Sequence, residues 1–228
     1  MKLIKGWYLP ANDTHFEQYI TDEGYQEVHR KAILDFVKEQ KGELGNALDI
    51  GAHVGFWLKD MCKEFKRVYA FEPINAVRDC IHHNVKADNY KLLPYGLSDK
   101  EGTLKVVWNE NETGNTYISE NGDTEIEVKR LDDLNNLPKV DYIKIDAEGH
   151  ELDVCRGGIN YIKEHKPFVH VEVKDKVMRR HGIGLPDVID FFNDVLDYRR
   201  KFAIKSEMVF GPNAVSYTHL TLPTIRTV

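Results

Sequence analysis

The sequence contains no hydrophobic run that approaches a membrane-spanning helix, which needs about 20 apolar residues. The segment from Met1 to Trp7 also lacks the apolar stretch of a secretory signal peptide. Cysteine is scarce: Cys62, Cys80 and Cys155 form an odd number without a CxxC pair, so no disulfide framework is expected. These absences predict a soluble cytoplasmic protein with reduced thiols and no membrane span.

An excess of positive charge is also lacking, because the 228 residues carry a formal net charge of −6. A protein of this charge has no global basic field to hold nucleic acid, and we expect no nucleic-acid partner. The length suits one domain with a substantial core. We expect an arm and a helix over residues 1–45 and the main domain over 46–214. The threonine-rich, almost uncharged stretch 215–228 departs in composition, and we expect it to be a non-native tail.

Short apolar runs alternate with segments of helical period along most of the chain. Residues 1–20 are aromatic and show no dominant period. Helices are predicted at 22–40, 56–65, 73–85, 151–163 and 185–198, and strands at 46–50, 67–71, 91–95, 141–145 and 167–173. Further strands at 103–108 and 124–130 flank a polar loop, and 200–210 resembles a hairpin. The pattern predicts an α/β fold: a doubly wound, mostly parallel sheet with helices on both faces and antiparallel additions.

Such sheets bind ligands at the carboxyl ends of their strands. The stretch Ala47-Leu-Asp-Ile-Gly-Ala-His-Val-Gly55 predicts a strand, a tight turn and a helix, with glycines that allow backbone N–H groups to approach a ligand. Two glycines alone are a weak signal. Glu72 strengthens it, because it lies 21 residues after Gly51, near the spacing at which a carboxylate binds ribose hydroxyls. The alternative is a solvated glutamate before a helix.

The ordered set of motifs resembles one family. Asp49-Ile-Gly-Ala-His-Val-Gly55, Phe71-Glu72-Pro73, Asn84, Gly96-Leu97-Ser98 and Lys144-Ile-Asp-Ala-Glu-Gly-His-Glu151 are similar to the FkbM family of S-adenosylmethionine-dependent methyltransferases, from about Ala47 to Glu172. The resemblance implies a class I methyltransferase, Rossmann-like fold. It also implies methyl transfer from S-adenosyl-L-methionine, usually to a hydroxyl of a sugar, glycan or similar natural product.

The same resemblance assigns cofactor contacts by position. It places the amino-acid end of the cofactor beside Gly51, Ala52, His53 and Gly55 with Asp49 beneath, the ribose at Glu72-Pro73, the adenine between Leu97 and Ser98, and the methyl group near Asp146. His53 stands where the family often has asparagine, and either side chain forms hydrogen bonds.

Candidate catalytic residues lie near the methyl end. Lys144 faces the same side as Asp146, two residues later, and a lysine within an apolar strand needs an acidic partner such as Asp146 or Glu172. Either a structural ion pair or a catalytic role fits this pattern. We expect Asp146 or Glu172 to remove or orient the acceptor's proton. His150 is a further candidate, although a surface role is the commoner one. Glu148 and Glu151 suit a helix start, where acids act as caps.

Several alternatives stay open at this level. Asp146 and Glu172 could share a divalent cation, but two acids are a thin ligand set, and a metal-free base is favoured. The acceptor could be an amino group, such as that of an amino sugar, instead of a hydroxyl. An NAD-binding oxidoreductase is disfavoured by the missing third glycine of the dinucleotide turn, and a non-catalytic module by the intact acids. The sequence names neither the acceptor nor the oligomeric state.

Overall fold

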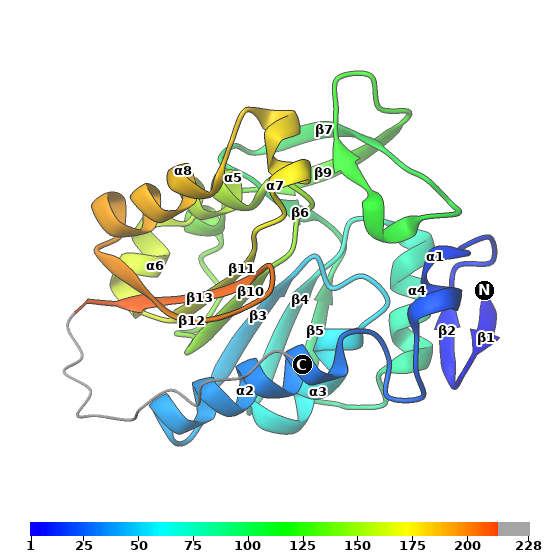
Figure 1. Cartoon of the computed structure of the whole chain (residues 1–228), viewed down its shortest axis with the longest axis horizontal. Coiled ribbons are helices and arrows are strands. Elements are labelled where there is room, and N and C mark those ends of the chain that lie inside the picture. Colours follow the sequence, from blue (N-terminus) through cyan, green and yellow to red (C-terminus); the bar gives the residue numbers. More distant parts are fainter. Residues whose placement is uncertain (214–228) are drawn as a thin grey trace.

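A seven-stranded sheet forms the centre of the computed structural model, which describes residues 1–213 (Figure 1). Its strands, in chain order, are β3 (Asn46–Ile50), β4 (Arg67–Phe71), β5 (Tyr90–Leu93), β10 (Tyr142–Ile145), β11 (Phe168–Glu172), β12 (Tyr198–Ile204) and β13 (Glu207–Pro212). In space the order is β12-β13-β11-β10-β3-β4-β5. The five strands from β11 to β5 are parallel, and β13 and β12 add an antiparallel edge. The predicted doubly wound sheet is therefore confirmed.

Helices cover both faces of this sheet. They are α2 (Glu27–Lys41), α3 (Phe56–Glu64), α4 (Asn75–Asn84), α5 (Glu151–Arg156), α6 (Ile159–His165) and α8 (Leu185–Asp190), the last continued by a π-helical turn at Phe191–Val195. Side chains from α2, α3 and α4 pack with Ala47 and Tyr142 on one face. Those from α5, α6 and α8 pack with Leu48 and Ile143 on the other. Successive strand residues point to opposite faces, so each central strand serves two cores and is apolar almost throughout.

The order in which the chain adds strands to the sheet reverses between β3 and β10, which are parallel neighbours. The connection after β3 runs through α3 toward β4, whereas the one after β10 runs through α5 and α6 toward β11. The loops after β3 and β10 therefore part at the carboxyl ends of these strands. A crevice opens at such a switch point, and ligands of open α/β sheets bind there.

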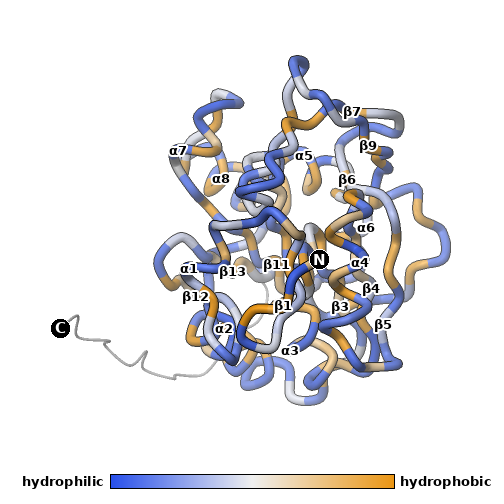
Figure 2. The backbone as a smooth tube through the Cα atoms, turned by 90° about the vertical axis from the view of Figure 1, so that its right-hand side faces the viewer, coloured by the Kyte–Doolittle hydropathy of each residue, from blue (hydrophilic) through white to orange (hydrophobic). Residues whose placement is uncertain are grey.

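A second, smaller sheet and the N-terminal arm border this crevice. The smaller sheet has the order β6-β9-β7-β8, and its strands are β6 (Gly96–Leu97), β7 (Gly102–Val107), β8 (Tyr117–Ile118) and β9 (Thr124–Lys129). The arm holds a hairpin, β1 (Lys2–Ile4) and β2 (Trp7–Leu9), which packs beside α4, and a short helix α1 (His15–Tyr19) (Figure 1). Hydrophilic stretches lie mostly at the periphery in Figure 2, around a more hydrophobic centre.

The structure corrects some predicted boundaries. The helix predicted to begin at Pro73 begins at Asn75, because the Glu72 carboxylate accepts a hydrogen bond from the Ile74 amide and keeps this segment extended. The single helix predicted over 151–163 is two helices, separated at Gly157 and Gly158. A side chain at Gly157 would overlap the backbone of Ser98, so the chain bends there without a Cβ.

The N-terminal segment also differs from the prediction, and the prediction for the C-terminal segment concerns residues that the structure does not describe. The segment predicted to be irregular, residues 1–20, contains the hairpin and α1, whose elements are too short to show a period. The expected non-native tail, 215–228, lies outside the described residues, and the division at 45/46 stays a prediction. Within residues 1–213, every helix is too short or too polar to cross a membrane.

Candidate active site

One cavity lies at the switch point and extends from the turn after β3 to the end of β11. Its walls include Gly51, Ala52 and His53 after β3, Glu72 and Pro73 after β4, Gly96 and Leu97 of β6, and Lys144, Asp146 and Glu172. Most of the residues predicted to bind the cofactor and those predicted to act on the acceptor therefore line the same space, although they are up to 121 positions apart in the sequence.

The turn after β3 is held by its own hydrogen bonds. The amides of Gly51 and Ala52 donate to the carbonyl oxygen of Phe71, at 3.0 and 3.1 Å, and the Gly55 amide donates to Ala52. Gly51 has φ +76°, and a Cβ there would overlap the carbonyl oxygen of Asp146. All three amides are thus hydrogen-bonded within the protein, and Gly55 does not line the cavity. Gly51 and Ala52 do line it, and their contact with a cofactor stays a prediction.

Glu72 is a buried carboxylate at the cavity wall. It accepts hydrogen bonds from the amides of His53, at 3.0 Å, and Ile74, at 2.9 Å. Burial raises the pKa of Glu72 to about 7. Each oxygen has used one lone pair, and a carboxylate offers about four acceptor positions. Two remain for a ligand, as a pair of ribose hydroxyls requires.

Of the two residues predicted to flank the adenine, one lines the cavity and the other does not. Leu97 lines the cavity, but Ser98 is fully buried and does not. The Ser98 hydroxyl contacts Nε2 of His150 at 2.9 Å, and Nδ1 of His150 lies 2.9 Å from the Asp153 carboxylate. Both ring nitrogens of His150 are thus engaged within the protein, which leaves no polar ring atom for an acceptor. Sequence reasoning placed Ser98 by its position after Leu97 and could not see that its side chain points inward.

Lys144 joins the turn to the methyl end of the cavity. Its ammonium donates to the carbonyl oxygen of Gly51 at 3.0 Å and lies 3.5 Å from Asp49 and 3.4 Å from Asp146. Burial alone would lower the pKa of Lys144, but Asp146 and Asp49 outweigh it and raise the pKa. The predicted partner Asp146 is confirmed. Glu172 is not a partner, and Asp49, beneath the turn, replaces it because β3 and β10 place Asp49 and Lys144 side by side.

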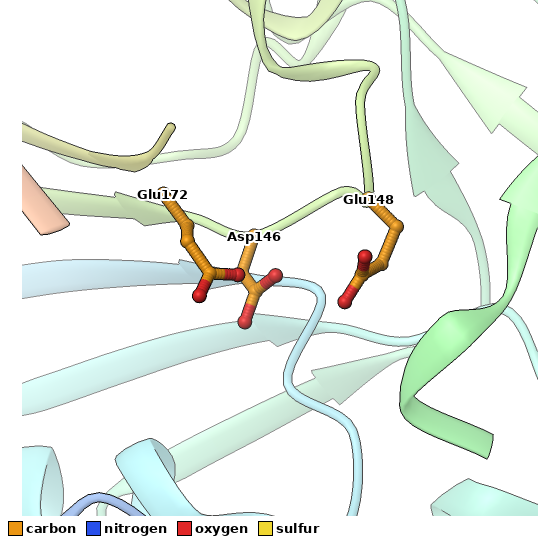
Figure 3. Close-up of side chains that lie close together, drawn as sticks. All are labelled: Asp146, Glu148 and Glu172. Atoms are coloured by element: carbon orange, nitrogen blue, oxygen red, sulfur yellow. The ribbon is translucent and has the colours of Figure 1, made fainter. Parts of the chain in front are cut away.

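Three carboxyl groups gather at the far end of the cavity. Asp146, Glu148 and Glu172 each offer an oxygen within 4.8 Å of the others, and Figure 3 shows their side chains directed into one space. The Lys174 ammonium lies 2.7 Å from Glu172 and 3.3 Å from Glu148. Glu148 is therefore part of this cluster and not a helix cap. Glu151, in the first turn of α5, accepts from the amides of Ala147 and Gly149, which precede the helix, and so holds the loop before α5.

The cluster separates the acids by their affinity for protons. Burial alone would raise the pKa of Asp146, but Lys144 and Lys174 outweigh it and lower the pKa. Burial and the neighbouring Asp146 raise the pKa values of Glu148 and Glu172. At neutral pH one proton can therefore reside on a glutamate while Asp146 is ionised. Two neighbouring acids whose pKa values are shifted in opposite directions suit an acceptor that must lose a proton.

Comparison with known proteins identifies the domain. Residues 49–201 match the model of the methyltransferase FkbM domain. The chain belongs to the FkbM methyltransferase family. A solved FkbM methyltransferase from Methylobacillus flagellatus KT aligns with a TM-score of 0.53 and 19% identity, covering 74% of this chain and 43% of that one. The fold is that of the class I methyltransferases, as predicted.

Curated relatives of the FkbM domain are themselves methyltransferases. The chain is 30% identical over 147 residues to the hexuronic acid methyltransferase AglP of Haloferax volcanii, covering 62% of this chain and 61% of that protein. It is 26% identical over 152 residues to methyltransferase sdnD of Sordaria araneosa, covering 48% of this chain and 59% of that protein. The chain thus spans about three fifths of the length of these relatives.

The FkbM domain of this chain also has a cover, which two irregular segments of the chain form. His15, Phe16, Tyr25 and Gln26 of the arm line the cavity opposite the sheet, together with Thr113–Thr116 of the loop between β7 and β8. The two segments are hydrogen-bonded to each other, since the amides of Thr14 and His15 donate to the carbonyl oxygen of Asn111. The aromatic residues of the arm were a signal for such a role. The sequence gives no comparable signal for Lys174, which lies just past β11 and pairs with Glu148 and Glu172.

Proposed function

We propose that this chain transfers the methyl group of S-adenosylmethionine to a hydroxyl oxygen of a sugar, glycan or related natural product. One observation carries the proposal: a single cavity holds both a ribose-type carboxylate, Glu72, and a cluster of tuned acids at Asp146, Glu148 and Glu172. Membership of the FkbM methyltransferase family supports the reaction, and the hexuronic acid methyltransferase among the relatives supports a sugar as acceptor.

The residues present fit the cofactor. Glu72 retains two acceptor positions for ribose hydroxyls, with Pro73 and Leu97 beside it. Asp49 is fully buried, and in the described part of the chain its two carboxylate oxygens have no hydrogen-bond partner. Burial raises the pKa of Asp49 and Lys144 opposes this shift, and the carboxyl group lies under the turn that would receive a cationic ligand. When bound, S-adenosylmethionine supplies an electrophilic methyl group on a good leaving group, so the protein's task is alignment and proton removal.

On the acceptor side, the acids divide the work. Asp146 is held ionised by Lys144 and Lys174, so it accepts a hydrogen bond from the acceptor hydroxyl and orients its oxygen. Burial and Asp146 raise the pKa of Glu172, so its ionised form, whose population grows as pH rises, is the stronger base. This ionised form takes the hydroxyl proton as the new carbon–oxygen bond forms and the carbon–sulfur bond of the cofactor breaks. Lys144 does not touch the acceptor in this scheme. It sets the charge of Asp146 and keeps the turn in place.

We further propose that the reaction needs no metal. The three acids have the ligand type that hard divalent cations prefer. The Lys174 ammonium, however, already lies among them and neutralises the charge that would attract a cation. A metal would have to displace this ion pair.

A second candidate is methylation of an amino group, as on an amino sugar. The observation that favours it is the same ion pair, because a site that accommodates the Lys174 ammonium beside two carboxylates has the chemistry to bind an acceptor ammonium. The NAD-dependent oxidoreductase considered from the turn alone has no support from a methyltransferase family.

The test has two parts. Isothermal titration with S-adenosylhomocysteine, S-adenosylmethionine and NAD should show binding of the first two only. A panel of uronic acids, neutral sugars and amino sugars, incubated with methyl-labelled cofactor and read by mass spectrometry and NMR, should show label on oxygen. Label on nitrogen would favour the second candidate, and binding of NAD alone would refute both.

A further inference from the structure

A buried chain of three side chains connects the cover to the cofactor turn. Nε2 of His53 lies 2.8 Å from the Thr113 hydroxyl, and that hydroxyl in turn contacts the Asp13 carboxylate. Asp13 and Thr113 are fully buried or nearly so, at 0% and 2% exposed. Asp13 also accepts hydrogen bonds from the amides of Thr113, at 3.1 Å, and Phe16, at 2.9 Å. Three segments far apart in the sequence meet here.

The chemistry of the three groups fixes the direction of every proton. The Asp13 carboxylate accepts from two backbone amides, and the Thr113 hydroxyl donates its single proton to the same group. The Thr113 oxygen must then accept from His53, which places the ring proton on Nε2. Burial lowers the pKa of His53 to about 4, so the ring is neutral at physiological pH. Nδ1 consequently carries a lone pair and no proton.

We propose that Asp13 and Thr113 are positioning residues that hold His53 in the Nε2–H tautomer, so that Nδ1 accepts a hydrogen bond from the ammonium group of the bound cofactor. This inference rests on the proposed function. His53 lines the cavity next to Glu72, whose carboxylate accepts from the His53 amide, and the ring is packed against Phe16 and Phe56. A fixed ring with a fixed tautomer offers one acceptor atom to the ligand, without reorientation.

The electrostatic surroundings favour a cationic donor at this atom. Asp13 and Asp146 both act on the His53 ring, and Lys144 opposes them with a smaller effect. A neutral hydroxyl gains little from these negative charges, whereas an ammonium gains from each. Asp13 of the arm and Thr113 of the loop would thereby contribute to cofactor affinity, although of these three side chains only that of His53 would touch the cofactor.

The three hydrogen-bonded side chains of Asp13, Thr113 and His53 form the proposed relay. Replacing Thr113 by valine tests it, because valine keeps the shape of the side chain and leaves both backbone hydrogen bonds of Asp13 intact. Titration should compare S-adenosylhomocysteine with 5′-methylthioadenosine, which lacks the amino-acid end. Thr113→Val should raise the Kd for S-adenosylhomocysteine about tenfold, the loss of roughly one hydrogen bond to a charged group, and leave the Kd for 5′-methylthioadenosine within about twofold. Thr113→Ser should restore wild-type binding of both.

Thr14→Val is the matched control. It removes a threonine hydroxyl from the same contact between arm and loop, 3.3 Å from the Asn111 carbonyl oxygen, without touching His53. Both of its Kd values should equal those of the wild type. Equal losses for the two ligands in Thr113→Val, or no loss, would overturn the relay while the proposed function stands. Absence of S-adenosylhomocysteine binding to the wild type would instead refute the proposed function.

Nitrogen-15 NMR of the ligand-free protein gives an independent readout. The ring of His53 should show the Nε2–H tautomer in the wild type and in Thr113→Ser, and a mixture of tautomers in Thr113→Val. A wild-type ring protonated on Nδ1 would overturn the proposal without reference to any ligand.

Discussion

The Lys144 ammonium donates a hydrogen bond to the carbonyl oxygen of Gly51 over 3.0 Å and so ties the end of β10 to the turn after β3. The same ammonium lies 3.5 Å from Asp49 and 3.4 Å from Asp146. Asp49 lies on β3 and Asp146 directly follows β10, and these two strands flank the switch point. One cation therefore supports both the shape of the turn and the charge of the acid nearest the proposed methyl group.

Replacing Lys144 by methionine should lower the free energy of unfolding by about 3–5 kcal/mol, because Asp49 would remain buried without a counter-ion. Urea denaturation monitored by circular dichroism measures this. Lys144→Arg, which retains the charge, should lose less. Lys31→Met, which breaks the exposed pair with Asp35, should leave stability almost unchanged. Comparable effects of Lys144→Met and Lys31→Met would contradict the assigned role.

Cofactor binding should weaken below neutral pH because of Glu72. Its pKa in the ligand-free protein is about 7, and ribose hydroxyls bind the ionised form, so binding below pH 7 must release a proton. The Kd for S-adenosylhomocysteine should rise as pH falls from 8 to 5.5, by up to about tenfold per unit below pH 7. Calorimetry in buffers of different ionisation enthalpy measures the released proton. Glu72→Gln should bind weakly at every pH and lose this dependence.

Alanine substitutions at Gly51 and Gly182 should distinguish the cost of backbone strain from the cost of steric overlap. Both have positive φ, but a Cβ at Gly182 would meet no atom within 4 Å, whereas one at Gly51 would overlap Asp146. Gly182→Ala should cost about 1–2 kcal/mol of stability, the ordinary cost of the left-handed conformation. Gly51→Ala should cost clearly more and abolish binding of S-adenosylhomocysteine. Similar thermal melts and similar binding for the two variants would show that the turn tolerates displacement.

Asp146→Asn should separate catalysis from binding. The amide is a weaker acceptor for the acceptor's hydroxyl, so kcat should fall by about 10²–10⁴-fold while the Kd for S-adenosylhomocysteine changes little. Glu172→Gln should behave in the same way. Steady-state kinetics with the acceptor found in the screen, together with calorimetry, distinguishes the two effects. Undiminished turnover of Asp146→Asn would reject its catalytic role.

Chelation tests the proposed metal-free mechanism. Because Lys174 already neutralises Glu148 and Glu172, turnover should be unchanged after dialysis against EDTA and after addition of Mg²⁺ or Mn²⁺. Loss of activity in EDTA with recovery on adding a divalent cation would show that the acid cluster binds a metal in place of Lys174.

Local pattern was sufficient for the core of the fold. Strands β3 and β4 begin and end where the apolar runs predict, since these runs are bounded by glycine and proline and buried on both faces. The pairing of Lys144 with Asp146 also followed from alternation along one strand. Its pairing with Asp49 needs the register of two strands, which a single sequence does not reveal.

The contact between the two segments of the cover could not be predicted for the same reason. Asp13 and Thr113 are 100 positions apart, and each is a common turn residue in a segment without a period. Their burial and mutual contact depend on the paths of two irregular segments across the sheet. His150 and Ser98 show the converse: both occupy plausible positions in the chain, but their side chains satisfy each other.

The cavity walls come from two kinds of segment, which have different partners in the proposed function. The turn after β3 and the ends of β4 and β10 would hold the cofactor, whereas the arm and the loop between β7 and β8 would also face the acceptor. Exchange of these outer segments between homologous enzymes is a natural way to retarget the reaction. The contact of Thr113 with both Asp13 and His53 sets the condition for a working chimera, since the arm, the loop and the residue at position 53 would have to be inherited together.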